Sequence, residues 1–107
     1  MAELFAAVCS VDFQVCKTEA VPARLRFMDL FLSVQNGVNQ VGLSFEDRQD
    51  FLVGEQFPNY IEIRLPMSYL ADIQFLLKHW SQKNLEIGYD PATGTVANFC
   101  LRSVNHP

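Results

Sequence analysis

The stretch "RLRFMDLFLSVQNGVNQVGLSFED", residues 24–47, carries the strongest fold signal in the chain. Asn36-Gly37 is the preferred pair for a two-residue type I′ hairpin turn, in which both central residues need positive φ. With Gln35 opposite Val38, the numbers of paired positions sum to 73, and the pairs on one face are all apolar. These pairs are Leu32 with Val41, Leu30 with Leu43 and Met28 with Phe45. Turn chemistry and apolar pattern therefore predict the same antiparallel hairpin.

The predicted hairpin has a second, mixed face. A shift of one residue would turn the apolar set of one strand away from that of the other, so the register is well specified. The same register places Arg26 opposite Asp47 as a weak ion pair at the rim. The second face carries Phe27, Asp29, Phe31 and Ser33. We expect another part of the fold to cover this face in part.

The segment before the hairpin is predicted to be a long strand. Apolar residues alternate along it: Phe5, Ala7, Cys9, Val11, Phe13 and Val15. We expect these positions to be buried. Because Leu4, Ala6 and Val8 are also apolar, the first half should be covered on both sides or lie in the middle of the sheet.

The segment after the hairpin, Phe45–Asn59, is ambiguous between helix, strand and loop. Gly54 and Pro58 favour a turn or an irregular connection. Beyond it, residues 60–65 alternate as a strand, and Pro66 suits the first position of a helix. That helix is predicted over 66–83, with strands at 85–89 and 95–103 after it.

These elements, in the order β-β-β-β-α-β-β, predict one α+β domain over residues 1–107. Its sheet is expected to be twisted and mainly antiparallel, with one long helix packed on one face. At 107 residues and 50% hydrophobic composition, the chain has the usual size of a single domain. Strand order is left open. One helix covers only about 10 Å of sheet width, so some apolar surface of the sheet is expected to remain uncovered.

The predicted helix has one side chain in an unexpected place. Its apolar stripe is expected to face the sheet, and consists of Tyr69, Leu70, Ile73, Leu76, Leu77 and Trp80. Phe75 lies on the opposite, polar face, with Asp72 three residues before it and His79 one turn after it. Three explanations stay open: a stray exposed apolar residue, cover by the loop Phe45–Asn59, or a protein contact surface, where aromatic anchors are enriched.

Charge and segment lengths restrict the classes of partner. The chain has 12 acidic and 8 basic residues, a formal net charge of −4, so nucleic-acid binding is disfavoured. Its longest apolar run, Leu4–Cys9, is far shorter than the ~20 residues that span a membrane. A secretory signal would begin with a basic segment followed by an unbroken apolar one. This chain instead has acidic residues there, Glu3 and Asp12. We expect a cytoplasmic protein without membrane association.

No catalytic or metal-binding signature is found. Cys9, Cys16 and Cys100 are an odd set without a C-x-x-C pair, and reduced, mostly buried thiols are expected. His79 lies seven residues after Asp72, yet no motif ties a nucleophile to them. The glycines form no phosphate-binding loop. We expect no catalytic residues, no metal and no cofactor, although two carboxylates meeting across the fold would escape detection.

The sequence therefore predicts a small acidic non-enzymatic binding protein, which acts as a homodimer or binds another protein. The candidate interaction surface comprises Phe27, Phe31, Asp72, Phe75 and His79. The alternative is a small-molecule binder or minor enzyme with an apolar pocket between helix and sheet.

Overall fold

The computed structural model describes residues 2–16, 25–35, 37–79 and 82–103, and these form one curled, mixed sheet with a single α-helix. The strands are β1 (Ala2–Cys16), β2 (Leu25–Gln35), β3 (Val38–Glu46), β4 (Leu52–Phe57), β5 (Tyr60–Pro66), β6 (Lys83–Tyr89) and β7 (Val96–Ser103). A 3₁₀ turn, η1 (Met67–Tyr69), leads directly into helix α1 (Leu70–His79).

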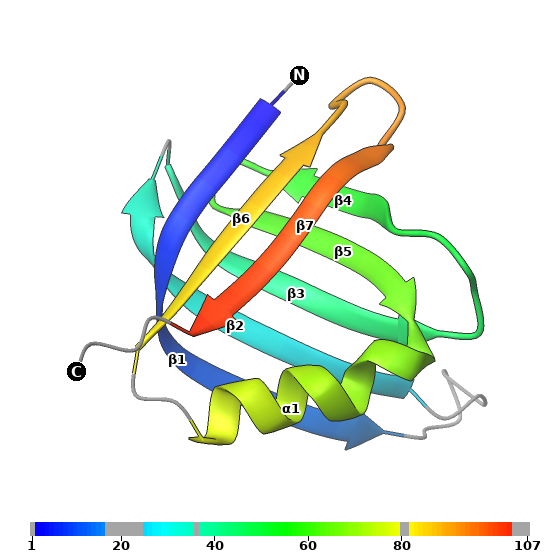
Figure 1. Ribbon diagram of the computed structural model, residues 1–107. Helices are drawn as coiled ribbons and strands as arrows, with labels where there is room; N and C mark the ends of the chain where they lie inside the picture. The colour runs from blue at the N-terminus through cyan, green and yellow to red at the C-terminus, as the bar shows by residue number, and fades with distance from the viewer. Residues whose placement is uncertain (1, 17–24, 36, 80–81, 104–107) are drawn as a thin grey trace.

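The sheet has the order β4-β5-β3-β2-β1-β6-β7 and curls into a half-barrel. In Figure 1, β1, β6 and β7 cross in front of the other strands, and α1 lies across the lower end. The predicted antiparallel pairing holds for every neighbouring pair except β3 and β5, which run parallel. Inward side chains from the strands and α1 form one core: Leu4, Ala6, Met28, Leu30, Leu32, Val41, Leu43, Phe45, Val53, Ile61, Ile63, Leu65, Leu70, Ile73, Leu85, Ile87 and Tyr89.

The predicted hairpin is present as β2 and β3, with one change of register. Gln35 pairs with Val38 as predicted, and Gly37 has a φ of +81°; Asn36 lies outside the described residues. Between Phe31 and Gln35 the register then shifts by two. The observed pairs are Leu30 with Val41, Met28 with Leu43 and Arg26 with Phe45. An even shift keeps each residue on its face, so the apolar face is confirmed, whereas the predicted partners and the pairing of Arg26 with Asp47 are wrong.

The first half of β1 buries the opposite set of residues to the one predicted. Leu4 and Ala6 belong to the core, whereas Phe5 is 51% exposed. β1 does lie in the middle of the sheet, between β2 and β6. Because both sets are apolar in this half, alternation alone could not indicate which set faces inward.

Cys9 is the extra residue of a β-bulge, since the pairing of β1 with β2 is interrupted between Val8 and Ser10. A single inserted residue exchanges the two faces of a strand, because side chains alternate with a period of two. Beyond the bulge the inward pairs are Val11 with Leu30 and Phe13 with Met28. After Cys9 the predicted set therefore lies on the inner face, but Val11 is 40% and Phe13 38% exposed, so the expectation that these positions are buried is wrong for Phe5, Val11 and Phe13.

β4 replaces most of the irregular connection expected between β3 and β5. Gly54, which favoured a loop in the sequence, lies within β4 beside the ion pair of Arg64 and Glu62, whose Nε and Oε1 are 3.0 Å apart. A Cβ atom at Gly54 would lie 2.8 Å from Arg64 Nε and 3.0 Å from Glu62 Oε1. The glycine thus makes room for a charged pair of the neighbouring strand, and it does not mark a chain break.

The helix is shorter than predicted, because Pro66 ends β5 and is followed by η1. At the other end, Lys83 already belongs to β6, and Trp80 lies outside the described residues. Leu70 and Ile73 are buried as predicted, but Tyr69 is 45% exposed. Tyr69 lies in the 3₁₀ turn, where successive side chains are spaced differently from those of an α-helix, so it leaves the predicted stripe.

Candidate binding site at the edge strand β7

β7 is an edge strand that is fixed to the rest of the sheet at one corner. Thr95, just before β7, bridges to Leu52 at the start of β4, and the Val53 amide donates a 2.8 Å hydrogen bond to the Gly94 carbonyl. In the sheet formed by the described residues, no strand lies beside β7 on the side opposite β6. One edge of β7 is therefore open from Val96 onwards.

A groove follows this open edge. Its first part, about 350 Å³, is lined by Asp50, Phe51, Leu52, Tyr69, Thr95, Val96, Ala97, Asn98 and Phe99. Its second part, about 320 Å³, is lined by Tyr69, Asp72, Ile73, Leu76, Phe99, Cys100 and Leu101. Both parts are lined by Tyr69 and Phe99, and we call the two parts together the β7 groove. Its other side is made by the loop before β4, by η1 and by α1.

Three aromatic rings join the two sides of the β7 groove. The ring centroids of Phe51 and Tyr69 are 5.0 Å apart in an edge-to-face arrangement, and those of Phe51 and Phe99 are 5.3 Å apart. Both spacings lie in the favourable range for aromatic pairs. The loop, the 3₁₀ turn and β7 each contribute one ring, so this cluster holds the groove walls in place.

Two charged side chains of the described residues line the β7 groove, and both are acidic. Asp50 accepts a 3.0 Å hydrogen bond from Arg48 Nε, which partly neutralises it. Asp72, in the first turn of α1, is exposed and has no ion-pair partner among the described residues. Arg102 at the far end of β7 contacts Glu86 of β6 at 3.4 Å. Among the described residues, the groove thus offers apolar and aromatic surface with one carboxylate, at its helix side, that has no ion-pair partner.

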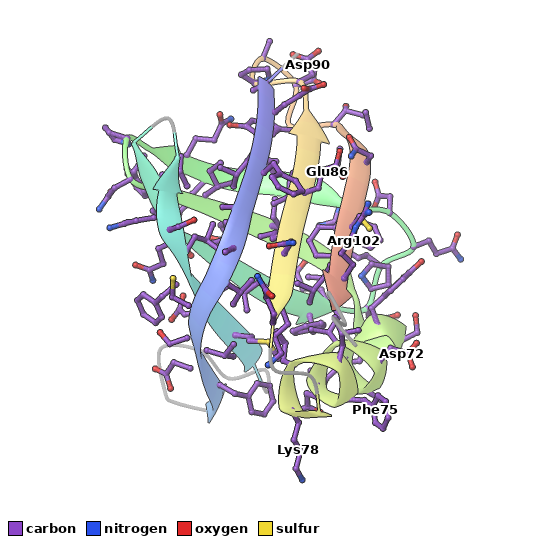
Figure 2. All side chains as sticks on the ribbon, turned by 60° about the vertical axis from the view of Figure 1, so that its left-hand side comes forward. Asp72, Phe75, Lys78, Glu86, Asp90 and Arg102 are labelled. Atoms are coloured by element: carbon purple, nitrogen blue, oxygen red, sulfur yellow. The ribbon has the colours of Figure 1, made fainter. Side chains whose placement is uncertain are left out.

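The residues predicted to form an interaction surface lie in two places. Phe75 is 60% exposed, so the loop 45–59 does not bury it. Figure 2 shows Phe75 and Lys78 projecting from α1 away from the strands, with Asp72 on the side of the helix. Phe31 lies on the outer face of β2 and is 38% exposed. The side chains of His79 and Phe27 lie outside the described residues.

A second, more open groove lies between α1 and β1. It has a volume of about 290 Å³ and is lined by Val11, Phe13, Met28, Gln74, Leu77 and Lys78. Its position between helix and sheet is the one that the small-molecule alternative requires. Among the described residues that line it, Lys78 is the one ionisable side chain, and none of them carries a carboxylate.

Acidic side chains at the end of β3, just after it and on β5 take part in ion pairs. Arg48 binds Glu46 at 3.3 Å and Asp50 at 3.0 Å, and Arg64 binds Glu62 at 3.0 Å. The hydrogen bond from Arg64 to Glu62 also raises the pKa of the guanidinium. Within the described ranges no group of three or more His, Cys, Asp or Glu side chains could hold a metal ion. No described helix is long and apolar enough to cross a membrane.

The described cysteines are free thiols, but they are less buried than expected. Cys9 is exposed at its bulge and Cys100 is half-buried in β7. The expectation of mostly buried thiols is wrong for Cys9. The side chain of Cys16 lies outside the described residues.

Searches with family models, among curated proteins and among solved structures find no match to this chain. The β7 groove was not predicted from the sequence, because its walls come from a loop, a 3₁₀ turn and an edge strand that are far apart in the chain. A local signal was present in Phe51, an aromatic residue in a polar stretch. Only the strand order shows what it packs against.

Proposed function

We propose that this protein is a non-enzymatic binding module that takes up an extended segment of another protein as an additional strand beside β7. The observation that carries the proposal is the open edge of β7 along an apolar groove. In this mode of recognition, main-chain hydrogen bonds supply affinity and side-chain pockets supply specificity. The rings of Phe51, Tyr69 and Phe99 would provide such pockets.

The two edges of the sheet differ in how well they are protected. Natural edge strands avoid unwanted pairing by means of bulges, charges and covering loops. β4 has a register shift between Val53 and Gln56 and presents the exposed Glu55. β7 has a register shift of its own between Val96 and Asn98, but from Asn98 to Ser103 it pairs regularly with β6, and its one charged residue, Arg102, is near its end. The longer stretch of regular and nearly uncharged edge is therefore the one beside the groove.

The dimensions of the β7 groove suit one extended chain. From Val96 to Arg102, β7 spans roughly 20 Å at about 3.3 Å per residue, which is the length of a strand of six or seven residues. Because the loop at Asp50–Leu52 and helix α1 stand on the far side, an added strand would be enclosed. This favours a single segment over the sheet edge of a second copy.

The proposal is tested with random nonapeptides displayed on phage and selected on the immobilised full-length protein. Selected peptides are resynthesised with alternate amides N-methylated, and their affinities are measured by fluorescence anisotropy. We expect one alternating set of methyl groups to weaken binding at least about tenfold and the other set to have little effect, because only one set faces β7. Tyr69→Ala should also weaken binding, whereas Phe57→Ala, an exposed residue on the opposite edge, should not.

Two results would contradict the proposal. The first is a selection that enriches no peptide over an unrelated immobilised protein. The second is equal loss of affinity from both sets of N-methyl groups, because a peptide held by its side chains alone would lack the alternation.

A homodimer is the second candidate function. It is supported by the exposed aromatic side chains on α1 and on the outer face of the sheet, Phe75, Phe31 and Phe5. Exposed apolar surface of this kind is often covered by a second copy of the chain. A cytoplasmic location is part of both proposals, and the free thiols of Cys9 and Cys100 are compatible with a reducing compartment.

A further inference from the structure

We infer that the partner segment of the β7 groove carries a lysine or arginine, which Asp72 binds at the helix side of the groove. This inference rests on the proposed function and adds the chemistry of the partner. Its basis is the distribution of charge among the residues that line the groove.

The β7 groove has acidic lining residues and, within the described chain, no basic ones. A partner with acidic side chains would meet like charges, and a neutral partner would leave the Asp72 carboxylate without an ion-pair partner. A basic side chain is attracted by both acids and by the net charge of −4 of the chain. Electrostatic complementarity of this kind selects among partners more strongly than it adds affinity.

Asp72 and Asp50 do not contribute equally. Arg48 Nε lies 3.0 Å from Asp50 Oδ1, so that carboxylate already has a cationic partner. Asp72 lines the groove together with Cys100 and Leu101, and it forms no ion pair with any described residue. Asp72 is therefore the carboxylate that remains available to a partner.

The placement of Asp72 also indicates where the basic residue lies. Asp72 adjoins the part of the groove formed by the second half of β7. The aromatic pocket of Phe51, Tyr69 and Phe99 adjoins its first half. The expected segment has an apolar side chain in this aromatic pocket and a basic side chain a few residues away, opposite Cys100 or Leu101.

The experiment repeats the peptide selection on wild type, Asp72→Asn, Asp72→Lys and Asp12→Lys. Asp12 is an exposed acid of β1 outside the groove, and its substitution by lysine changes the net charge as much as Asp72→Lys does. We expect peptides selected on wild type to be enriched in Lys or Arg. Their affinity should fall about three- to fivefold in Asp72→Asn, as for one exposed ion pair, and further in Asp72→Lys, which should select acidic peptides. Asp12→Lys should behave as wild type.

The possible failures differ. If peptides bind with the N-methyl alternation but without preference for basic residues, the inference is wrong and the proposed function stands. If Asp12→Lys weakens binding as much as Asp72→Lys, the attraction is a general charge effect and the role of Asp72 is wrong. If no peptide is selected on any variant, the proposed function itself fails.

Discussion

The amide of Val53 donates a 2.8 Å hydrogen bond to the carbonyl oxygen of Gly94, and this bond joins β4 to the turn just before β7 at one corner of the sheet. β4 and β7 are first and last in the strand order, so the bond brings together the two ends of the curled sheet. Beyond this corner the edges separate, and the β7 groove lies along the opening. The corner thus determines where the groove begins.

Gly94→Ala is expected to destabilise the protein by about 2–4 kcal/mol. Gly94 has a φ of +78°, which strains any residue with a Cβ atom, and that atom would lie 2.6 Å from the Val53 carbonyl oxygen. Main-chain atoms of both strands would have to move apart. The free energy of unfolding measured in urea tests this prediction.

Gly37→Ala is the matched control, since Gly37 has a similar φ of +81° but a less severe contact, 3.2 Å from the Pro58 carbonyl oxygen. It should cost about 1–2 kcal/mol, mainly from the backbone conformation. If both substitutions lowered the free energy of unfolding equally, the close contact between Gly94 and Val53 would make no difference to the effect of the substitution.

Leu4→Ala and Phe5→Ala should differ sharply in stability. Leu4 is 2% exposed in the core, so its truncation should cost about 2–5 kcal/mol. Phe5 is half exposed on the outer face, and its loss should cost less than about 1 kcal/mol. Urea unfolding of both variants measures the difference. If Phe5→Ala destabilised the protein more than Leu4→Ala, the odd-numbered residues of this half of β1 would face the core. That result would contradict the bulge at Cys9.

The contrast between Leu4 and Phe5 shows where the sequence signal was insufficient. Around the Asn36-Gly37 turn, one face is apolar and the other mixed, so the inward residues of β2 and β3 could be predicted. In the first half of β1 both faces are apolar, and a bulge leaves no local mark in the sequence. β4 was not predicted because Gly54 favoured a loop in the sequence. In the structure Gly54 instead leaves space for the side chain of Arg64, a residue of another strand.

The candidate site was less predictable than the fold. The periodicity of the helix placed Asp72 and Phe75 on its outer, polar face, because it depends only on neighbours along the chain, but it left open whether a loop covers Phe75. The groove depends on β7 being an edge strand, which follows from the order of all seven strands. Neither Phe51 nor Phe99 indicates in its own segment that the two rings meet.

The stability of the protein is expected to depend on Tyr60 at alkaline pH. Burial, followed by the negative charges of Glu62, Asp29 and Glu55, raises the pKa of Tyr60 from 10.0 to about 12. The folded state therefore retains a proton that the unfolded state loses first, so stability is full below pH 10 and falls between pH 10 and about 12. Tyr60→Phe should reduce the slope of unfolding free energy against pH over this window. An unchanged slope would show that Tyr60 ionises alike in both states.

The homodimer proposal makes a specific prediction for the helix surface. Phe75→Asp would place a charge at the centre of any contact made by the outer face of α1, and burying that charge is costly. We expect a dimeric mass for the wild type by light scattering after size exclusion, and a monomeric mass for Phe75→Asp. Phe57→Asp, an exposed position on β4, should remain dimeric. If Phe75→Asp is dimeric and Phe31→Asp is monomeric, the outer face of the sheet is the interface. A monomeric wild type would rule out the homodimer, and the β7 groove would then remain as the proposed site of protein binding.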